Sequence, residues 1–491
     1  MLACIKIKEL TSTCFYHASN FFTASLVSLE NKIITMKLHS NGMFLIFFLL
    51  KNVSLRIIIY SIFILIKVYF MVSYFIEYNR YMNLIGMAVL VAVAYLFSNN
   101  RSAVNRKLVI NGLLFQAALA IFVLKTDIGF TLFNTISLGM SNLYGFAEVG
   151  INFVFGSLAD PSGPWGVVFA VRVLPIIIFF GAFTSLLFYL GVVQKIVWGL
   201  TYVIQPILGT SGAETLCAVA NSFLGQTEAP LLIKHYLKNV TRSEMMVVMA
   251  SGFATVSGSL LAVYASMGVP SLHMLAASVM AIPGSIVMAK ILYPETEKSK
   301  LEHAAEPVVV SNAANVLDAI SMGTTDGLYL ALNVGAMLIS FLGLIALTNS
   351  VLGLVSTFGN YLLPYVGCTY LLPAINLNFI FSYLFAPVSY LMGFVGQEAL
   401  HVGNLLGIKV TVNEFVAFNS MLSMQLSLRT QAILTYALCS FANFSCIGIQ
   451  IGGIGVLVPD KRIWLSELGL RALLAATLAN LMSALIAGLL I

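Results

Sequence analysis

Long apolar segments alternate with short polar ones along most of the chain. About 20 apolar residues are needed for a helix to cross a bilayer. Segments of this kind lie near 82–98, 108–125, 166–192, 243–266, 270–291, 328–352, 429–454 and 463–490. We predict a transmembrane helix over each, which gives an all-α multi-spanning membrane protein with about eight core helices.

Two further segments, near 211–238 and 397–426, are too short and too polar to be ordinary spans. Each has room for two half-helices of roughly 10–14 residues, a length typical of re-entrant segments. The first is interrupted at Gly225-Gln226-Thr227 and the second between Gly407 and Asn413. Irregular backbone at membrane depth is tolerated only where protein buries it or where it lines a wet cavity. We therefore predict two re-entrant helical hairpins.

A short repeat connects the two hairpin segments. Phe253-Ala254-Thr255-Val256-Ser257 matches Phe441-Ala442-Asn443-Phe444-Ser445. Each motif follows a glutamate of the hairpin, Glu228 or Glu414, about 25 to 27 residues later. Interrupted segments at corresponding positions of two halves are typical of the binding site of a secondary transporter. The pattern predicts an inverted-repeat transport domain beside a scaffold domain.

Composition supports a membrane protein, because 59% of the 491 residues are hydrophobic and only 9% are charged. A soluble domain has roughly 25% charged residues. The net charge is +6, but no stretch resembles a basic nucleic-acid-binding surface. Short basic loops usually lie in the cytoplasm. Four such loops, near 101–107, 234–242, 294–312 and 461–462, fall on one side if each hairpin enters and leaves on that side. Both ends of the 82–491 core then lie on the other side.

This pattern divides the chain into five parts. Residues 1–81 form an N-terminal extension, for which two interpretations stay open: an extra membrane segment between Met43 and Ile76, or a mis-assigned start before Met82. The expected parts after it are scaffold helices (82–192), a first transport-repeat half with hairpin and broken helix (193–311), a scaffold helix with interfacial segments (312–395), and a second transport-repeat half with the last helix (396–491).

Glu228 and Glu414 are the main candidates for chemistry, because a carboxylate inside a membrane is costly and usually functional. Gln226, Thr227, Asn413 and Asn443 add neutral donors and acceptors nearby in the sequence. Together they suit an uncharged, hydroxyl-rich ligand. The arginines that clamp a phosphate or carboxylate are missing from this set. For Arg172, in an apolar segment, we favour a structural ion pair or a snorkelling side chain over a role in binding.

Other classes of site have little support. The six cysteines (Cys4, Cys14, Cys217, Cys368, Cys439 and Cys446) are scattered and form no CxxC pair, which argues against a disulfide framework or a zinc site. A helix break between Gly252 and Gly258 would free carbonyl oxygens for a hard cation. Small residues also serve helix packing, so both interpretations of this stretch stay open.

Five stretches make the chain resemble the concentrative nucleoside transporter family from about Met82 to the C-terminus. They are GQTEAPLL (225–232), SGFATVSGSLLAVYASMGV (251–269), ALNVGAMLISFLGLIAL (331–347), NEFVAF (413–418) and FANFSCIGI (441–449). The resemblance implies a homotrimer in the plasma (inner) membrane. It also implies nucleoside import by alternating access, coupled to symport of sodium or protons, with no further cofactor.

Residue roles also follow from the resemblance. It implies that Gln226, Thr227 and Glu228 face the nucleobase, with Gly225 at the hairpin tip and Leu260 on the apolar side of the base. It implies that Glu414 and Asn443 hold ribose hydroxyls beside Phe441. The implied sodium ligands are Asn221, Leu224, Thr255 and Val256.

Two positions depart from the family pattern. Cys446 stands where a ribose-contacting serine is usual, and a thiol is a weak hydrogen-bond partner. Thr255 stands where serine is usual, and it keeps the hydroxyl. We expect a cation-coupled nucleoside importer and no enzyme. The alternatives are a membrane enzyme acting on a nucleoside or lipid-linked substrate through paired glutamates, and an ion channel.

Overall fold

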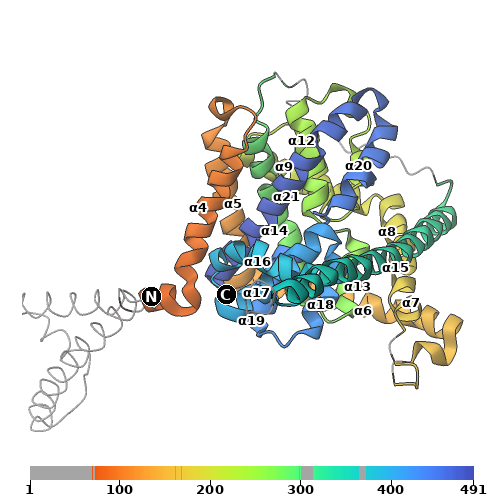
Figure 1. Cartoon of the computed structure of the whole chain (residues 1–491). Helices are drawn as coiled ribbons and strands as arrows, with labels where there is room; N and C mark the ends of the chain where they lie inside the picture. Colours follow the sequence, from red (N-terminus) through yellow and green to blue (C-terminus); the bar gives the residue numbers. More distant parts are fainter. Residues whose placement is uncertain are drawn as a thin grey trace, which may run out of the picture. The chain divides into compact units, whose positions relative to one another are not determined.

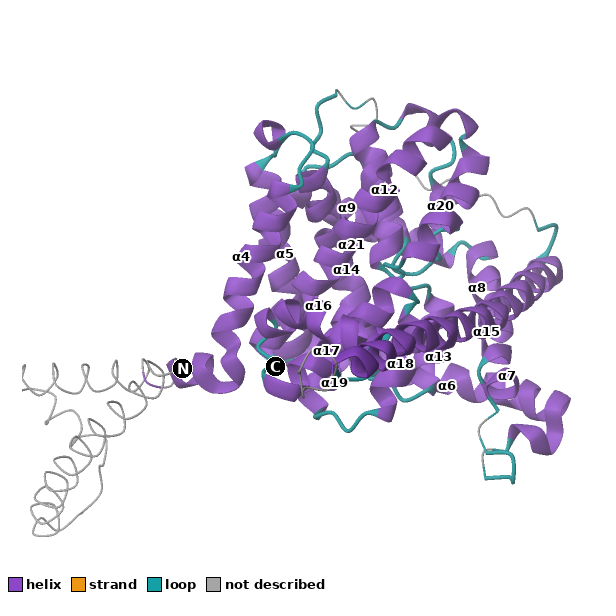
Figure 2. Cartoon of the chain, in the orientation of Figure 1, coloured by secondary structure: helices purple, strands orange, loops and turns teal. Residues whose placement is uncertain are grey.

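The computed structural model describes residues 69, 72–160, 162–166, 168–297, 299, 313–363 and 372–491. The chain divides into two compact units, Met1–Tyr74 and Phe75–Ile491. Most of the 1–81 extension, including most of the predicted segment from Met43 to Ile76, lies outside the described residues. The second unit is helical, and its described part contains no strand (Figure 2).

Seven helices of the described chain are long and apolar enough to cross a membrane, or eight if a bent pair counts as one span. This confirms the predicted fold class. The spans are built from α4 (Arg80–Leu96), α5 (Arg106–Lys125), α7 (Phe169–Arg172) with α8 (Leu174–Tyr189), α12 (Arg242–Ala254) with α13 (Gly258–Ser266), α14 (Ser271–Leu292), α15 (Val316–Leu362) and α21 (Arg462–Leu490).

The structure differs from the predicted spans in three places. The 429–454 segment is two short helices, α19 (Leu428–Leu438) and α20 (Phe444–Leu457), so neither is a complete span. Helix α15 has 47 residues, because polar turns before 328 remain helical. Three helices were not predicted, because polar residues interrupt their apolar pattern: α6 (Asp127–Phe155), α9 (Val192–Leu208) and α16 (Leu377–Leu391).

The last helix, α21, lies inside the bundle and contacts two interrupted helices. These are α12 with α13, and α19 with α20. Helix α21 packs against α12, α14 and α19 (Figure 1). Its Asn480 side chain donates a hydrogen bond to the Ala254 carbonyl, 2.8 Å away, at the end of α12. The two breaks also meet, since the Phe441 N–H donates to the Thr255 carbonyl at 3.2 Å. Backbone groups freed by one broken helix are thus satisfied by the other half.

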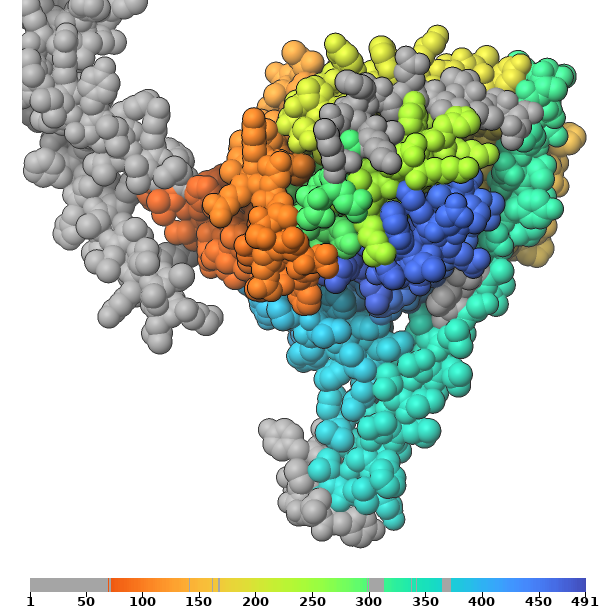
Figure 3. Space-filling model, turned by 90° about the horizontal axis from the view of Figure 1, so that it is seen from above, coloured from red at the N-terminus to blue at the C-terminus, as the bar shows by residue number. Residues whose placement is uncertain are grey.

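The described parts of the basic loops lie at one end of the second unit. The Asn99 N–H donates to the Leu292 carbonyl at 2.9 Å, and Lys461 Nζ donates to the Val240 carbonyl at 2.6 Å. Figure 3 shows this face, where the side chains of α4, α5, α12 and α21 lie next to one another. Near the opposite end, an Arg80 Nη2 donates to the Ile491 carbonyl at 3.0 Å. Assignment of the basic end to the cytoplasm stays a prediction.

Helices α8 and α15 approach closely at glycines. A methyl group added at Gly181 would lie 2.7 Å from the Gly323 carbonyl oxygen, and one at Gly327 would lie 2.8 Å from the Ile178 Cα. Small residues allow such contact between membrane helices. The rest of α15 exposes large apolar side chains, including Leu332, Ile339 and Leu347.

Gly327→Ala should therefore destabilise the protein. The methyl group would press on the α8 backbone, and overpacking of this kind costs about 1–3 kcal/mol. Thermal unfolding of the detergent-solubilised protein should show a lower midpoint. Gly343→Ala is the matched control on the same helix, since no atom lies within 4 Å of its added methyl group. Equal midpoints for the two variants would refute the close contact.

Candidate functional site

The first re-entrant hairpin turns at Gly225, as predicted. Helix α10 (Gly212–Ala220) leads into the tip, and the short helix α11 (Ala229–Leu232) leads away from it. The Glu228 N–H donates to the Gly225 carbonyl at 3.0 Å, and the Glu228 carboxylate accepts the Gly225 N–H at 3.1 Å. Among the described residues, Gly225 is the hydrogen-bond partner of this carboxylate. The Glu228 side chain is otherwise exposed.

The second hairpin is formed by α17 (Gly396–Thr411) and α18 (Glu414–Ser423). Its break is shorter than predicted, because the helix continues through Gly407 to Thr411. At Gly407 the side chain of Phe381, on α16, packs against the helix backbone, so the missing side chain serves close packing and not a turn. The chain leaves helical geometry at Val412 and Asn413, where the Asn413 side chain accepts the Val416 N–H at 2.9 Å.

Glu414 joins three helices at the centre of this site. Its carboxylate accepts hydrogen bonds from Tyr264 Oη at 2.9 Å and from Asn443 Nδ2 at 3.2 Å. The Asn443 amide oxygen accepts the Cys446 N–H at 3.1 Å and thereby caps α20. The structure therefore brings Glu414, Asn443 and Cys446 together. Glu414 is only 5% exposed, so a ligand that replaces one of these donors would find a desolvated carboxylate.

Tyr264 was not identified from the sequence. It lies in α13, one helical turn after Leu260, and both side chains are buried. That spacing places them on one face of the helix, which is the signal that could have revealed it.

The other predicted substrate residues lie around this centre in different settings. Gln226 is buried, and its amide oxygen has no hydrogen-bond partner among the described residues. The Thr227 side chain packs against Gly453 of α20. Phe441 is half-buried and contributes its N–H to the bond with Thr255.

The residues predicted to bind sodium also lie close together. Asn221 Nδ2 donates to Ser251 Oγ at 3.0 Å, while the buried Asn221 Oδ1 has no hydrogen-bond partner in the part of the chain that the structure describes. Thr255 Oγ1 donates to the Ser251 carbonyl at 2.9 Å. Leu224 and Val256 are buried in the same stretches of chain. The orphaned Asn221 oxygen, with the hydroxyl of Thr255, fits a hard cation, because such cations prefer oxygen ligands.

The tip of the first hairpin is hydrogen-bonded to the region of the candidate sodium ligands. The helix break predicted between Gly252 and Gly258 is present between α12 and α13, and the Gly258 N–H donates to the Phe223 carbonyl at 3.1 Å. Ser251, which contacts both Asn221 and Thr255, was not singled out from the sequence. Its position four residues before Thr255, on one helix face, is the available signal.

Arg172 and the cysteines have structural settings. Arg172 forms an ion pair with Glu148, with 2.6 Å between Nη2 and Oε1, as predicted. Cys217, Cys439 and Cys446 are buried and free. The remaining three cysteines lie outside the described residues.

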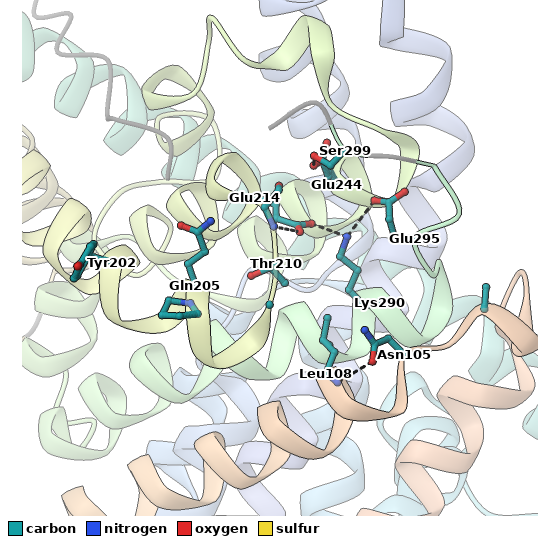
Figure 4. Close-up of a pocket in the computed structure, with 14 residues that line it drawn as sticks. Asn105, Leu108, Tyr202, Gln205, Thr210, Glu214, Glu244, Lys290, Glu295 and Ser299 are labelled. Atoms are coloured by element: carbon teal, nitrogen blue, oxygen red, sulfur yellow. Dashed lines mark hydrogen bonds and ion pairs between the residues drawn. The ribbon is translucent and has the colours of Figure 1, made fainter. Parts of the chain in front are cut away.

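A separate polar cavity of about 890 Å³ lies at the basic end (Figure 4). Lys290 Nζ lies 2.8 Å from a Glu214 carboxylate oxygen and 3.4 Å from one of Glu295. The other Glu214 oxygen accepts the Ser211 N–H at 2.8 Å, at the start of α10. This buried network fixes the base of the first hairpin to α14. The network could not be predicted from the sequence, because Glu214 and Lys290 lie far apart in the chain.

Family models match most of the chain. The N-terminal and C-terminal models of the "Na+ dependent nucleoside transporter" match residues 85–158 and 273–488. A "Nucleoside recognition" model matches residues 170–271, which include the first hairpin.

Similar proteins agree with these matches. An "Uncharacterized transporter" of Haemophilus influenzae is 44% identical, over 83% of this chain and 97% of its own. The "Nucleoside permease NupC" of Helicobacter pylori is 40% identical, over 84% and 98%. The solved structure of CNTnw "in an inward-facing substrate-bound state" is 39% identical with a TM-score of 0.77, over 83% of this chain and 98% of that one. The chain therefore belongs to the Na+ dependent nucleoside transporter family, the concentrative nucleoside transporters that its sequence resembles.

Proposed function

We propose that this multi-pass protein imports nucleosides across the plasma membrane by symport with sodium and by alternating access. The observation that carries the proposal is the buried Glu414 carboxylate, which is bonded to Tyr264 and Asn443 where the two broken helices meet. A nucleoside offers ribose hydroxyls to such an acceptor and base edges to the amide of Gln226. The printed name of the Helicobacter pylori relative, a nucleoside permease, supports the same substrate class.

The charge of the site favours an uncharged ligand. The predicted contacts are carboxylate, amide, hydroxyl and aromatic groups, while Arg172 is paired with Glu148 and the buried Lys409 interacts with the opposite charge of Glu414. A phosphate placed here would lose its hydration without a free cation to pair with, which is costly. Nucleosides are therefore better substrates than nucleotides.

Sodium is the coupling ion that we propose first. The family description supports it, and the neutral oxygens of Asn221 and Thr255 suit it. Protons are the alternative, in which case Glu228 or Glu414 would carry the charge.

The names of similar proteins support a transporter, since two of them are called a transporter and a nucleoside permease.

We further propose a homotrimer with a scaffold and a mobile transport domain. The glycine contact between α8 and α15, and the exposed apolar side chains of α15, suit a scaffold helix that faces another protomer. Helices α4 and α5, which the sequence predicts to be scaffold helices, pack directly against the predicted transport domain. They contact α14 of the first transport-repeat half and α21 of the second.

Uptake measurements with competitors test the substrate class. Cells that express the protein should take up radiolabelled uridine, and unlabelled uridine should compete. Uracil and UMP should compete poorly, because uracil lacks the ribose contacts and UMP brings an unpaired phosphate. Strong competition by UMP at equal concentration would contradict the proposed site.

Glu414→Gln should lower uridine uptake at least about tenfold, which corresponds to roughly 1.4 kcal/mol. The amide places a donor opposite the donors of Tyr264 and Asn443, and it removes the charge that strengthens bonds to ribose hydroxyls. Initial rates are normalised to protein in the membrane. Glu467→Gln is the control, since Glu467 forms an exposed pair with Arg242. Wild-type rates for Glu414→Gln would exclude the role.

Thr255→Val should raise the sodium concentration for half-maximal uptake several-fold, with less change in maximal rate. It removes one candidate ligand oxygen at nearly constant shape. Thr201→Val is the matched control, because Thr201 is also a buried helix threonine bonded to a backbone carbonyl, on α9. Wild-type uptake that ignores sodium and stops with a protonophore would replace sodium by protons and leave the nucleoside assignment intact.

A further inference from the structure

Gln450 is a buried amide in the otherwise apolar helix α20, where neither the family motifs nor the predicted site includes it. It follows Asn443 by seven residues and Cys446 by four, so all three share one helix face. The side chain is fully buried. Its Nε2 donates to the Met249 carbonyl of α12 at 3.1 Å, and this bond joins the two repeat halves.

Three amide groups meet at Gly252. A methyl group added there would overlap Gln450 Nε2, and it would lie 3.2 Å from Gln226 Cβ and 3.6 Å from Asn221 Oδ1. The amide oxygens of Gln450, Gln226 and Asn221 all lack hydrogen-bond partners in the described chain. A buried acceptor left unpaired costs about 1–3 kcal/mol. Three side chains with such an acceptor contact one glycine, which points to a cluster that a cation and a substrate complete.

We propose that Gln450 is a positioning residue that couples the cation site to the nucleobase site, an inference that rests on the proposed function. Its bond to Met249 fixes the amide plane and leaves Oε1 free toward neighbouring groups. Asn221, a candidate cation ligand, and Gln226, a candidate base contact, both lie beside the same glycine, Gly252. Gln450 thereby holds the hairpin tip against both broken helices, so that cation binding orders Gln226.

Coupling of this kind is reciprocal and typically amounts to a 5–150-fold change in affinity. In the wild type, the uridine KM should therefore fall as sodium rises. A residue that only fills space would affect protein level and leave this dependence unchanged.

Gln450→Leu tests the proposal, because it keeps the volume and removes both polar atoms. Uridine uptake is measured over a grid of sodium and uridine concentrations and normalised to protein in the membrane. The half-maximal sodium concentration should rise at least about fivefold, the low end of typical coupling. The uridine KM should lose most of its sodium dependence, while the rate at saturating sodium and uridine stays within about twofold of wild type. Gln450→Met, of similar volume, should behave in the same way.

Gln194→Leu is the matched control. Gln194 is also buried, and its Nε2 donates to the Phe188 carbonyl at 2.8 Å. Its Oε1 lacks a hydrogen-bond partner in the described chain, but Gln194 lies on α9, away from the proposed cluster. It should keep the wild-type sodium dependence.

The possible results distinguish failure of the proposed function from failure of the proposed role of Gln450. If the wild type shows no sodium-dependent nucleoside uptake, the proposed function fails, and the role of Gln450 fails with it. If wild-type uptake depends on sodium and both Gln450→Leu and Gln450→Met keep that dependence, only the role of Gln450 is overturned. Equal shifts in Gln194→Leu and Gln450→Leu would also overturn it, since they would reflect a general effect of losing a buried amide.

Discussion

The structure depends on satisfying backbone groups where helices are interrupted within the membrane. Hydrocarbon offers no hydrogen-bond partners, so each freed carbonyl or N–H needs one from the protein or from a bound ligand. Here the partners come from the other repeat half or from the last helix: Phe441 bonds to the Thr255 carbonyl, and Asn480 bonds to the Ala254 carbonyl. The same polar groups that make the breaks tolerable therefore form the candidate site.

This arrangement gives the two glutamates different settings. The Glu414 carboxylate already accepts hydrogen bonds from Tyr264 and Asn443. A ligand that binds there must therefore replace these hydrogen bonds or add to them. Glu228 turns back on Gly225 of its own hairpin and is left uncovered by the protein. A ligand can thus engage Glu228 without breaking bonds between helices. We infer that Glu414 defines a fixed part of the site, and that the first hairpin brings the adaptable part.

The sequence predicted those features that rest on local composition. The hairpin tip at Gly225 and the break near Thr255 were visible because small and polar residues interrupt apolar runs. The prediction that the second hairpin breaks from Gly407 onward was wrong there, because Gly407 allows close packing of Phe381 from another helix. Helices α6 and α9 were missed because they mix polar and apolar residues, and the ion pair of Glu214 with Lys290 was missed because it joins distant segments. Contacts that only the tertiary structure creates leave no periodic signal in one sequence.

The first hairpin is held differently at its two ends, which limits how it can move. At its base, Glu214 and Lys290 form a buried ion pair, and removing one partner of such a pair typically costs 3–5 kcal/mol. At its tip, neutral hydrogen bonds such as that between Gly258 and Phe223 make the contact. Breaking a neutral bond costs less than separating buried charges. A change of access is therefore expected either to open the tip or to carry the hairpin together with α14, since the base stays closed in both cases.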